Sequence, residues 1–274
     1  MTVVIERNGP SEPVSPGGSS AGAIFIHGAW LTPASWELFR SRYTACGYTC
    51  LAPAWPFEDL TIDELRRAPP AELAGLTIGR IVDHYAALVR QLPKPPLLVG
   101  HSFGGLFVQM LLDRGLGTAG VAIDPVPPRG VWPGFTSLRA ALPVLSTWGG
   151  WNRILTMTPA RFARDLAQSL GVDERQAAYD RYIVPTPGRI FYQAALGIGS
   201  RVDYANDRRA PLLLIAGERD RSIRALVVRA TYRRHLRSVA ETSFKLFPGR
   251  THWLILERGW EEVADYTIEW AAGH

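Results

Sequence analysis

The sequence has little cysteine, and this excludes two kinds of architecture. Only two of its 274 residues are cysteines, Cys46 and Cys50. A disulfide between them would close a very short loop and stabilise little, so a disulfide-stapled fold is excluded. With no other cysteine and with scattered histidines, the sequence does not support a structural zinc site, and we predict no metal site. We expect two buried thiols in a reducing compartment.

The chain also lacks long apolar runs, and none approaches the length that crosses a bilayer. Residues 1–22 have no basic patch followed by an apolar core, so they do not form a secretory signal. Their prolines, glycines and serines predict a flexible leader. Together these absences predict a cytoplasmic protein with no membrane partner.

Lysine is nearly absent, and the formal net charge of +5 comes almost wholly from arginine. Four arginines cluster on one predicted helix, at positions 229, 233, 234 and 237. No aromatic residues interleave them and no nucleic-acid module is present, so we interpret this cluster as a solvated helix face. The sequence therefore predicts no nucleic-acid partner.

What the chain does contain is an alternation of short apolar strands and amphipathic helices. Strands are predicted at residues 23–26, 48–52, 97–99, 119–123, 211–217 and 243–247, and helices at 33–45, 78–92, 223–236 and 260–272. This alternation is typical of an α/β fold with a mostly parallel sheet and helices on both faces. We expect a sheet of about six to eight strands.

The alternation stops between residues 127 and 209. This region is rich in proline, glycine and tryptophan, and its helix-like pieces lie near 159–170, 173–182 and 189–196. It has no strand as apolar as the others. The sequence therefore predicts a core made of residues 23–126 and 210–274, with residues 127–209 inserted as a mainly helical cap.

A Gly-X-Ser-X-Gly motif lies between an apolar run and a helical pattern. In Gly100-His101-Ser102-Phe103-Gly104, the serine would stand on a sharp strand-to-helix turn with its hydroxyl exposed. Amides at the start of the following helix can stabilise negative charge on a bound carbonyl. Alone, the motif fits equally well a glycine-rich turn in which Ser102 only caps the helix.

Other strand ends supply the partners that a serine nucleophile needs. In open α/β sheets, sites form beyond the carboxyl ends of the strands, where Ala29, Ser102, Asp220 and His252 are predicted to lie. His252 would take the proton of Ser102, and Asp220 would hold the imidazole in the right tautomer. The amides of Ala29 and Phe103 would form an oxyanion hole. Asp124 is the alternative acid, although the following Pro125 favours a structural turn there.

Four motifs together resemble those of the α/β-hydrolase-fold enzymes, over residues 23–272. They are His27-Gly28-Ala29-Trp30, Gly100-His101-Ser102-Phe103-Gly104-Gly105, Gly217-Glu218-Arg219-Asp220 and Gly249-Arg250-Thr251-His252. The resemblance implies the α/β-hydrolase fold and a Ser–Asp–His order of catalytic residues. The first motif is also similar to that of the group containing small plant methylesterases and hydroxynitrile lyases.

The leading functional hypothesis is a serine hydrolase that needs no cofactor. It would cleave a carboxylic ester, thioester or lactone of an apolar or aromatic small molecule through an acyl-enzyme. Five tryptophans are candidates for the substrate pocket: Trp30, Trp132, Trp148, Trp151 and Trp253. The small-molecule substrate is the expected partner, and the sequence leaves open whether the chain forms a dimer.

Three alternatives remain open from the sequence. A hydroxynitrile-lyase-like enzyme would need a lysine near the histidine, and Lys245 lies seven residues before His252. A cofactor-independent dioxygenase would use the histidine to deprotonate a heteroaromatic substrate. A hydrolase-fold small-molecule receptor would bind its ligand tightly without turnover.

Overall fold

A computed structural model of the protein describes residues 21–274, and it contains a six-stranded, wholly parallel main sheet. The strand order is β2-β1-β3-β4-β7-β8. The bounds are β1 Gly22–Ile26, β2 Thr49–Leu51, β3 Leu97–His101, β4 Ala119–Ile123, β7 Leu212–Gly217 and β8 Thr242–Phe247. This confirms the predicted α/β class. The predicted leader, residues 1–22, lies outside the described residues except for its last two positions.

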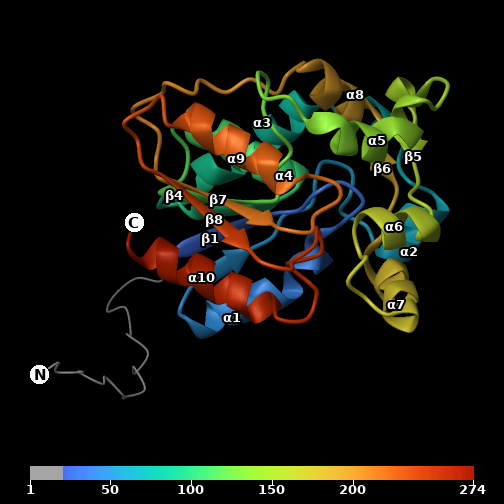
Figure 1. Ribbon diagram of the computed structural model, residues 1–274, viewed down its shortest axis with the longest axis horizontal. Coiled ribbons are helices and arrows are strands. Elements are labelled where there is room, and N and C mark those ends of the chain that lie inside the picture. The colour runs from blue at the N-terminus through green and yellow to red at the C-terminus, as the bar shows by residue number, and fades with distance from the viewer. Residues whose placement is uncertain (1–20) are drawn as a thin grey trace, which may run out of the picture.

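Helices cover both faces of this sheet (Figure 1). On one face lie α1 (Glu37–Ala45), preceded by the 3-10 turn η1 (Pro33–Trp36), and α10 (Trp260–Ala272). On the other face lie α3 (Ile78–Gln91), α4 (Phe103–Asp113) and α9 (Ala225–His235). The central strands β3 and β4 are buried at every position, which explains why their sequences are continuously apolar rather than alternating.

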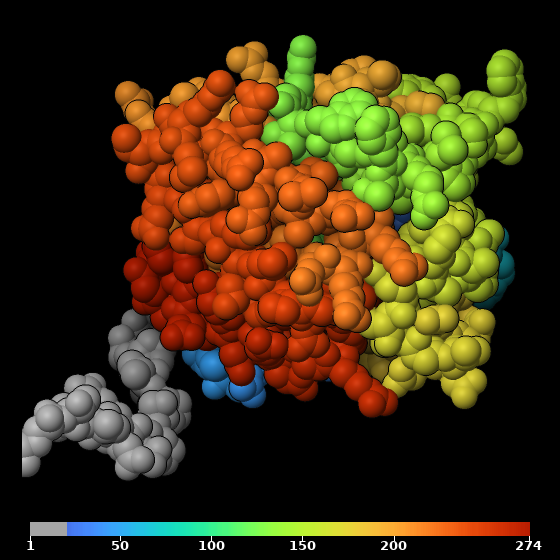
Figure 2. Space-filling model, in the orientation of Figure 1, coloured from blue at the N-terminus to red at the C-terminus, as the bar shows by residue number. Residues whose placement is uncertain are grey.

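Between β4 and β7 the chain forms a mainly helical layer at one end of the molecule (Figure 1). It contains α5 (Gly134–Leu145), η3 (Gly150–Asn152), α6 (Pro159–Asp165), α7 (Val172–Tyr182) and α8 (Arg189–Leu196). The short strands β5 (Ile154–Leu155) and β6 (Thr186–Pro187) pair antiparallel within it. In the space-filling view its green and yellow segments lie against the orange C-terminal part of the core (Figure 2).

Hydrogen bonds to the segment between β2 and β3 anchor this helical layer to the core. That segment contains α2 (Ile62–Arg67) and η2 (Ala71–Gly75) before α3. Arg66 of α2 donates to the carbonyl of Ile183 at 2.8 Å, and the amide of Ile78 donates to Gln193 Oε1 at 2.9 Å. The amide of Val184 donates to the carbonyl of Trp30 at 3.0 Å. The layer is therefore tied directly to a loop that carries a predicted site residue.

The expectation of two buried thiols is wrong. Cys46 is exposed and Cys50 is only partly buried, and both are free. The reason is their position: Cys46 follows the end of α1, and Cys50 lies on β2, which is the edge strand of the sheet. Within residues 21–274, no helix combines the length and the apolar character that a membrane crossing requires.

Candidate active site

Ser102 stands on a strained turn between β3 and α4. Its backbone has φ 56° and ψ −118°, a left-handed conformation that costs roughly 1–3 kcal/mol for a residue with a side chain. A Cβ on Gly100 would overlap the carbonyl of Gly104, and a Cβ on Gly104 would overlap the carbonyl of Ile26. The two glycines of the motif therefore allow α4 to pack tightly behind the turn, and the turn holds Ser102 at the end of the sheet.

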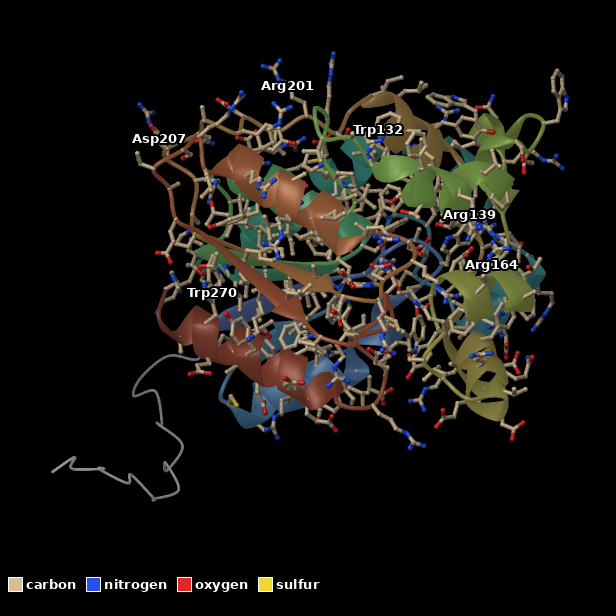
Figure 3. All side chains as sticks on the ribbon, in the orientation of Figure 1. Trp132, Arg139, Arg164, Arg201, Asp207 and Trp270 are labelled. Atoms are coloured by element: carbon tan, nitrogen blue, oxygen red, sulfur yellow. The ribbon has the colours of Figure 1, made fainter. Side chains whose placement is uncertain are left out.

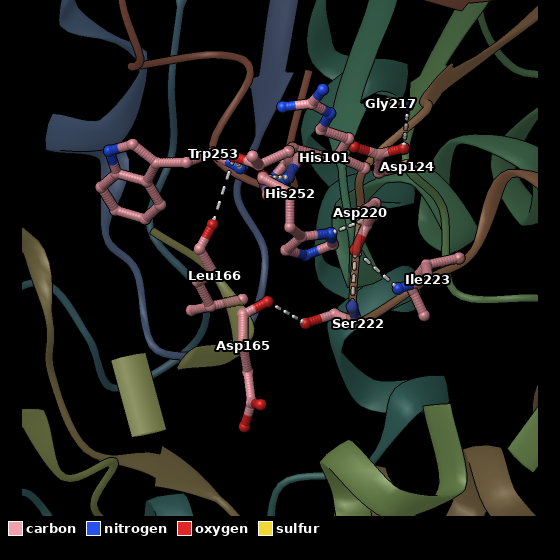
Figure 4. A network of polar contacts seen from close by, with 12 residues as sticks. His101, Asp124, Asp165, Leu166, Gly217, Asp220, Ser222, Ile223, His252 and Trp253 are labelled. Carbon is pink, nitrogen blue, oxygen red and sulfur yellow. Dashed lines mark hydrogen bonds and ion pairs between the residues drawn. The ribbon is translucent and has the colours of Figure 1, made fainter. Parts of the chain in front are cut away.

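His252 lines the same pocket as Ser102, and Figure 4 shows its imidazole facing the carboxyl group of Asp220. Nδ1 of His252 lies 2.6 Å from Asp220 Oδ2. The other oxygen of Asp220 accepts hydrogen bonds from the amides of Ser222 at 2.6 Å and Ile223 at 2.9 Å. These two amides fix the carboxyl group in the orientation that faces the imidazole.

Burial controls the protonation of this pair. Both side chains are almost fully enclosed, with relative exposures of 4% for His252 and 0% for Asp220. Burial lowers the pKa of the His252 imidazole, which favours the neutral ring. Burial also raises the pKa of Asp220, and the amide donors of Ile223 and Ser222 oppose that rise. A neutral His252 whose Nδ1–H donates to Asp220 leaves Nε2 able to accept a proton.

Asp124, the alternative acid, has a different set of contacts. It follows β4 with φ 41°, and its Oδ1 accepts a hydrogen bond from the amide of Gly217 at 2.8 Å. Burial and the nearby charge of Asp220 raise the pKa of Asp124 well above its usual value, which favours the neutral carboxyl. The structure thus places Asp220, and not Asp124, in hydrogen-bond contact with Nδ1 of His252.

Two residues outside the predicted catalytic set, His101 and Glu257, hold the His252 loop in place. Nε2 of His101, beside the nucleophile turn, donates to the carbonyl of His252 at 2.9 Å. Glu257 accepts hydrogen bonds from the amide of Thr251 at 3.0 Å and from its hydroxyl at 2.6 Å. Glu257 is ten residues past the last strand that the sequence predicts, residues 243–247, so no local pattern pointed to it.

The loop after β1 comes very close to Ser102. A Cβ on Gly28 would lie 2.8 Å from the Cβ of Ser102, so only glycine allows this approach. Both Ala29 and Phe103 line the same pocket as Ser102. Within residues 21–274, neither of their backbone amides donates a hydrogen bond to another group of the protein. Two unpaired N–H donors beside a serine suit a developing oxyanion.

A buried pair of titratable groups lies behind this loop. Nδ1 of His27 donates to the carbonyl of Gly28 at 3.0 Å, and the ring stacks on Trp55. Nε2 of His27 lies 3.6 Å from Glu58 Oε2. Burial lowers the pKa of His27 to about 4 and raises the pKa of Glu58 well above its usual value. Both groups are therefore favoured in their neutral forms.

A cavity of about 470 Å³ opens over Ser102 and His252 between the core and the helical layer. Its lining is mainly apolar, and it includes three of the predicted tryptophans: Trp30, Trp132 and Trp253. Trp30 and Trp253 are buried, whereas Trp132 lies at the mouth and is 63% exposed. Figure 3 shows Trp132 at the same end of the molecule as Arg139 and Arg164 of the helical layer.

The other two predicted tryptophans do not line this cavity. Trp148 follows α5 and is 93% exposed, so it has little contact with the rest of the protein. Trp151 packs against Tyr192 and under the guanidinium of Arg189. Their places are taken by residues that the sequence analysis missed, among them Phe191, whose ring contacts both Trp30 and Phe103.

One cluster has the side chains of a metal site. The candidate ligand atoms of His101, Asp124 and His252 lie within 4.8 Å of one another. However, His101 donates to the His252 carbonyl, Asp124 accepts from Gly217, and His252 is bonded to Asp220. Each of the three side chains is thus already hydrogen-bonded within the protein through one of its atoms, and we assign no ion to them.

The sequence matches the model of a family described as the alpha/beta hydrolase family over residues 23–266. The chain therefore belongs to the alpha/beta hydrolase family of enzymes. No curated protein sequence matches it.

Solved structures of this fold are similar over nearly the whole chain, at low sequence identity. A methylesterase from Arabidopsis is 13% identical with a TM-score of 0.69, and the match covers 93% of this chain and 100% of the other. A monoacylglycerol lipase from Paleococcus ferrophilus is 17% identical with a TM-score of 0.66, covering 91% and 93%. An esterase from Thermogutta terrifontis is 19% identical with a TM-score of 0.64, covering 93% and 91%. At these identities the similarity shows the shared fold.

Proposed function

We propose that this protein is a serine esterase with Ser102 as nucleophile, His252 as general base and Asp220 as the orienting acid. One observation carries the proposal: Ser102, His252 and the two unpaired amides of Ala29 and Phe103 all line a single cavity. That combination has a nucleophile, a proton acceptor and an anion site within one enclosed volume. The substrate class is a carboxylic ester, thioester or lactone with an apolar portion that fits the mainly apolar lining.

The chemistry follows from these positions. Nε2 of His252 accepts the hydroxyl proton as Ser102 Oγ attacks the carbonyl carbon, and Asp220 stabilises the resulting imidazolium. The carbonyl oxygen becomes an oxyanion that the amides of Ala29 and Phe103 stabilise, and each such donor contributes roughly 3 kcal/mol to the transition state. His252 then gives its proton to the leaving alcohol or thiol. Water, deprotonated by the same imidazole, hydrolyses the acyl-enzyme and regenerates Ser102.

The test combines active-site labelling with a substrate panel. A fluorophosphonate should label wild-type protein at Ser102, and labelling should be lost in Ser102→Ala. Ser102→Ala and His252→Ala should each lose nearly all hydrolysis of p-nitrophenyl esters while keeping the wild-type melting temperature. Thioesters and lactones assayed in parallel define the bond type. Undiminished hydrolysis by a well-folded Ser102→Ala protein would refute the assignment.

No observation favours the lyase alternative over the esterase. Lys245 lies on β8, with its ammonium group 4.6 Å from the ring centroid of Tyr266 on α10. That contact is on the face of the sheet that α1 and α10 cover, and Lys245 does not line the cavity. A cyanohydrin-cleavage assay on the same preparations tests this alternative directly.

A further inference from the structure

The cavity contains a guanidinium group for which the proposed triad has no use. Arg161 belongs to α6 of the helical layer and lines the same cavity as Ser102. The side chain is partly buried, and burial lowers the pKa of its guanidinium. Removing a charge from water is costly unless an opposite charge or several hydrogen bonds replace the solvent. The contacts of Arg161 therefore need an explanation.

Within the described part of the chain, Arg161 has no ion-pair partner. The nearby acid is Asp165, one turn further along α6, but both oxygens of its carboxylate accept hydrogen bonds from Arg164 at 2.7 Å. Arg161 itself makes one side-chain hydrogen bond, from Nη2 to the carbonyl of Ala140 at 3.1 Å. Its Nε is buried without a partner. A guanidinium has five N–H donors, so most donors of this one have no hydrogen-bond partner among residues 21–274.

The position of Arg161 relates it directly to the reacting centre. Its guanidinium carbon lies 5.8 Å from the ring centroid of Trp30, the residue that follows the oxyanion donor Ala29. Trp30 contacts Phe191 at 5.4 Å between ring centroids, and Phe191 contacts Phe103 at 5.1 Å. A continuous aromatic wall thus runs from the oxyanion amides to Arg161. A substrate lying along this wall would have its carbonyl at one end and the guanidinium at the other.

We propose that Arg161 binds a carboxylate carried by the substrate, so that the preferred esters have an apolar body and one negative charge remote from the scissile bond. This inference rests on the proposed esterase function. A carboxylate matches the planar fork of a guanidinium and supplies a single charge. Arg129, the other arginine that lines the cavity, is exposed at the surface, and the lining acid Asp165 is paired with Arg164. Among residues 21–274, the cavity interior therefore offers one guanidinium without an acidic partner, which suits one negative charge.

The competing explanation is that Arg161 only braces the helical layer by joining α6 to Ala140 of α5. The two explanations differ in what they predict for charged and neutral substrates of equal length. Suitable probes are p-nitrophenyl hemiesters of dicarboxylic acids, from glutarate to suberate, each paired with its methyl-capped neutral counterpart. The readout is the ratio of kcat/KM for the anionic ester to that for the neutral ester.

Wild-type protein should favour the anionic member at one chain length, and Arg161→Gln should lower the ratio by ~10- to 100-fold, the range expected for hydrogen bonds to a charged group. Arg161→Lys should retain part of the preference. Arg153→Gln is the matched control, because Arg153 is an exposed arginine of the same layer outside the cavity, and it should keep the wild-type ratio. A wild-type ratio near one, or an Arg161→Gln ratio equal to wild type, would overturn the proposal.

A binding measurement separates this inference from the esterase proposal. Calorimetry on Ser102→Ala protein compares 5-phenylpentanoate with 5-phenylpentanamide, so that no turnover is required. Tighter binding of the carboxylate, lost in the Ser102→Ala/Arg161→Gln double variant, supports the anion site even if no ester is hydrolysed. Equal affinity for the two ligands contradicts the anion site even if the esterase activity is confirmed.

Discussion

A single methyl group added at Gly28 should weaken the oxyanion hole without unfolding the protein. The new Cβ would lie 2.8 Å from the Cβ of Ser102 and 3.1 Å from the carbonyl oxygen of His101. Ordinary contacts to a Cβ begin at about 3.4 Å, so the loop and Ser102 must separate by roughly 0.6 Å, the difference between 3.4 and 2.8 Å. The φ angle of Gly28 is not in the left-handed region, so alanine fits its backbone conformation.

The expected loss of kcat follows from the donor distances that stabilise an oxyanion. Donors stabilise the oxyanion at 2.7–3.1 Å, and complete loss of one donor lowers kcat by about 10²–10³-fold. A displacement of roughly 0.6 Å weakens the amide of Ala29 without removing it, so we expect Gly28→Ala to lower kcat by about 10- to 100-fold. Because the oxyanion forms only after the substrate has bound, in the tetrahedral intermediate and the transition states that flank it, KM should change little.

The assay is steady-state hydrolysis of p-nitrophenyl butyrate, with the melting temperature measured on the same samples. Gly75→Ala is the matched control, since a Cβ at Gly75 meets no atom within 4 Å. It should keep wild-type kcat. If Gly28→Ala also kept wild-type kcat and melting temperature, the loop after β1 would not approach Ser102 as described, and the assignment of Ala29 to an oxyanion hole would fail.

Two further predictions concern buried carboxyl groups. In the same p-nitrophenyl ester assay, Asp220→Asn should lower kcat by about 10³–10⁴-fold, because His252 loses the partner that fixes its tautomer. Asp124→Asn should lower kcat by less than about tenfold, because the amide oxygen of asparagine can still accept the hydrogen bond from Gly217. Glu58→Gln tests the neutral pair behind the oxyanion loop through urea unfolding at several pH values. The unfolded chain ionises Glu58 above about pH 4.5, whereas the raised pKa keeps the folded state protonated, so the wild type loses stability as pH rises through this window. Glu58→Gln lacks this loss. As pH rises, the free energy of unfolding of Glu58→Gln should therefore increase relative to that of the wild type, by up to about 1.4 kcal/mol per pH unit. Parallel plots of unfolding free energy against pH for the two proteins would contradict the raised pKa of Glu58.

The main sheet could be predicted from the sequence because its signals are local. A strand buried on both faces needs a short continuous apolar run, and residues 97–99 and 119–123 have such runs between turn residues. Likewise, the nucleophile turn needs glycine at two fixed positions around Ser102, for the steric reasons that the structure displays. Each of these features is decided within about ten residues of chain.

The helical layer could be predicted only in outline, because tertiary packing decides its details. Helix α5 contains Pro143, which disrupts the usual helical signal, so the sequence does not predict this helix. Aromatic content alone could not separate Trp253, which is buried beneath α6 and α7, from Trp148, which is exposed. Arg161 was missed for the same reason: the sequence shows an ordinary arginine on a helix, and only the fold places it against Trp30.

The sequence motifs alone do not separate Asp220 from Asp124 as the partner of His252, because tertiary hydrogen bonds decide which carboxyl group faces the imidazole. Both residues follow parallel strands, so both arrive at the same end of the sheet. The turn after β7 supplies two amides that aim Asp220 at His252, whereas Asp124 is aimed at the amide of Gly217.

The hydrogen bond from the amide of Gly217 to Asp124 also positions the loop that carries His252. A Cβ on Gly217 would lie 2.9 Å from the carbonyl oxygen of Arg250 and 3.0 Å from that of Thr251, so Gly217 packs directly against the loop that carries His252. By holding the amide of Gly217, Asp124 fixes the strand end from which Asp220 departs and against which the His252 loop rests. Asp124 is thus a positioning residue for both members of the pair. This role requires a hydrogen-bond acceptor and no negative charge, which is why asparagine should replace it at little cost.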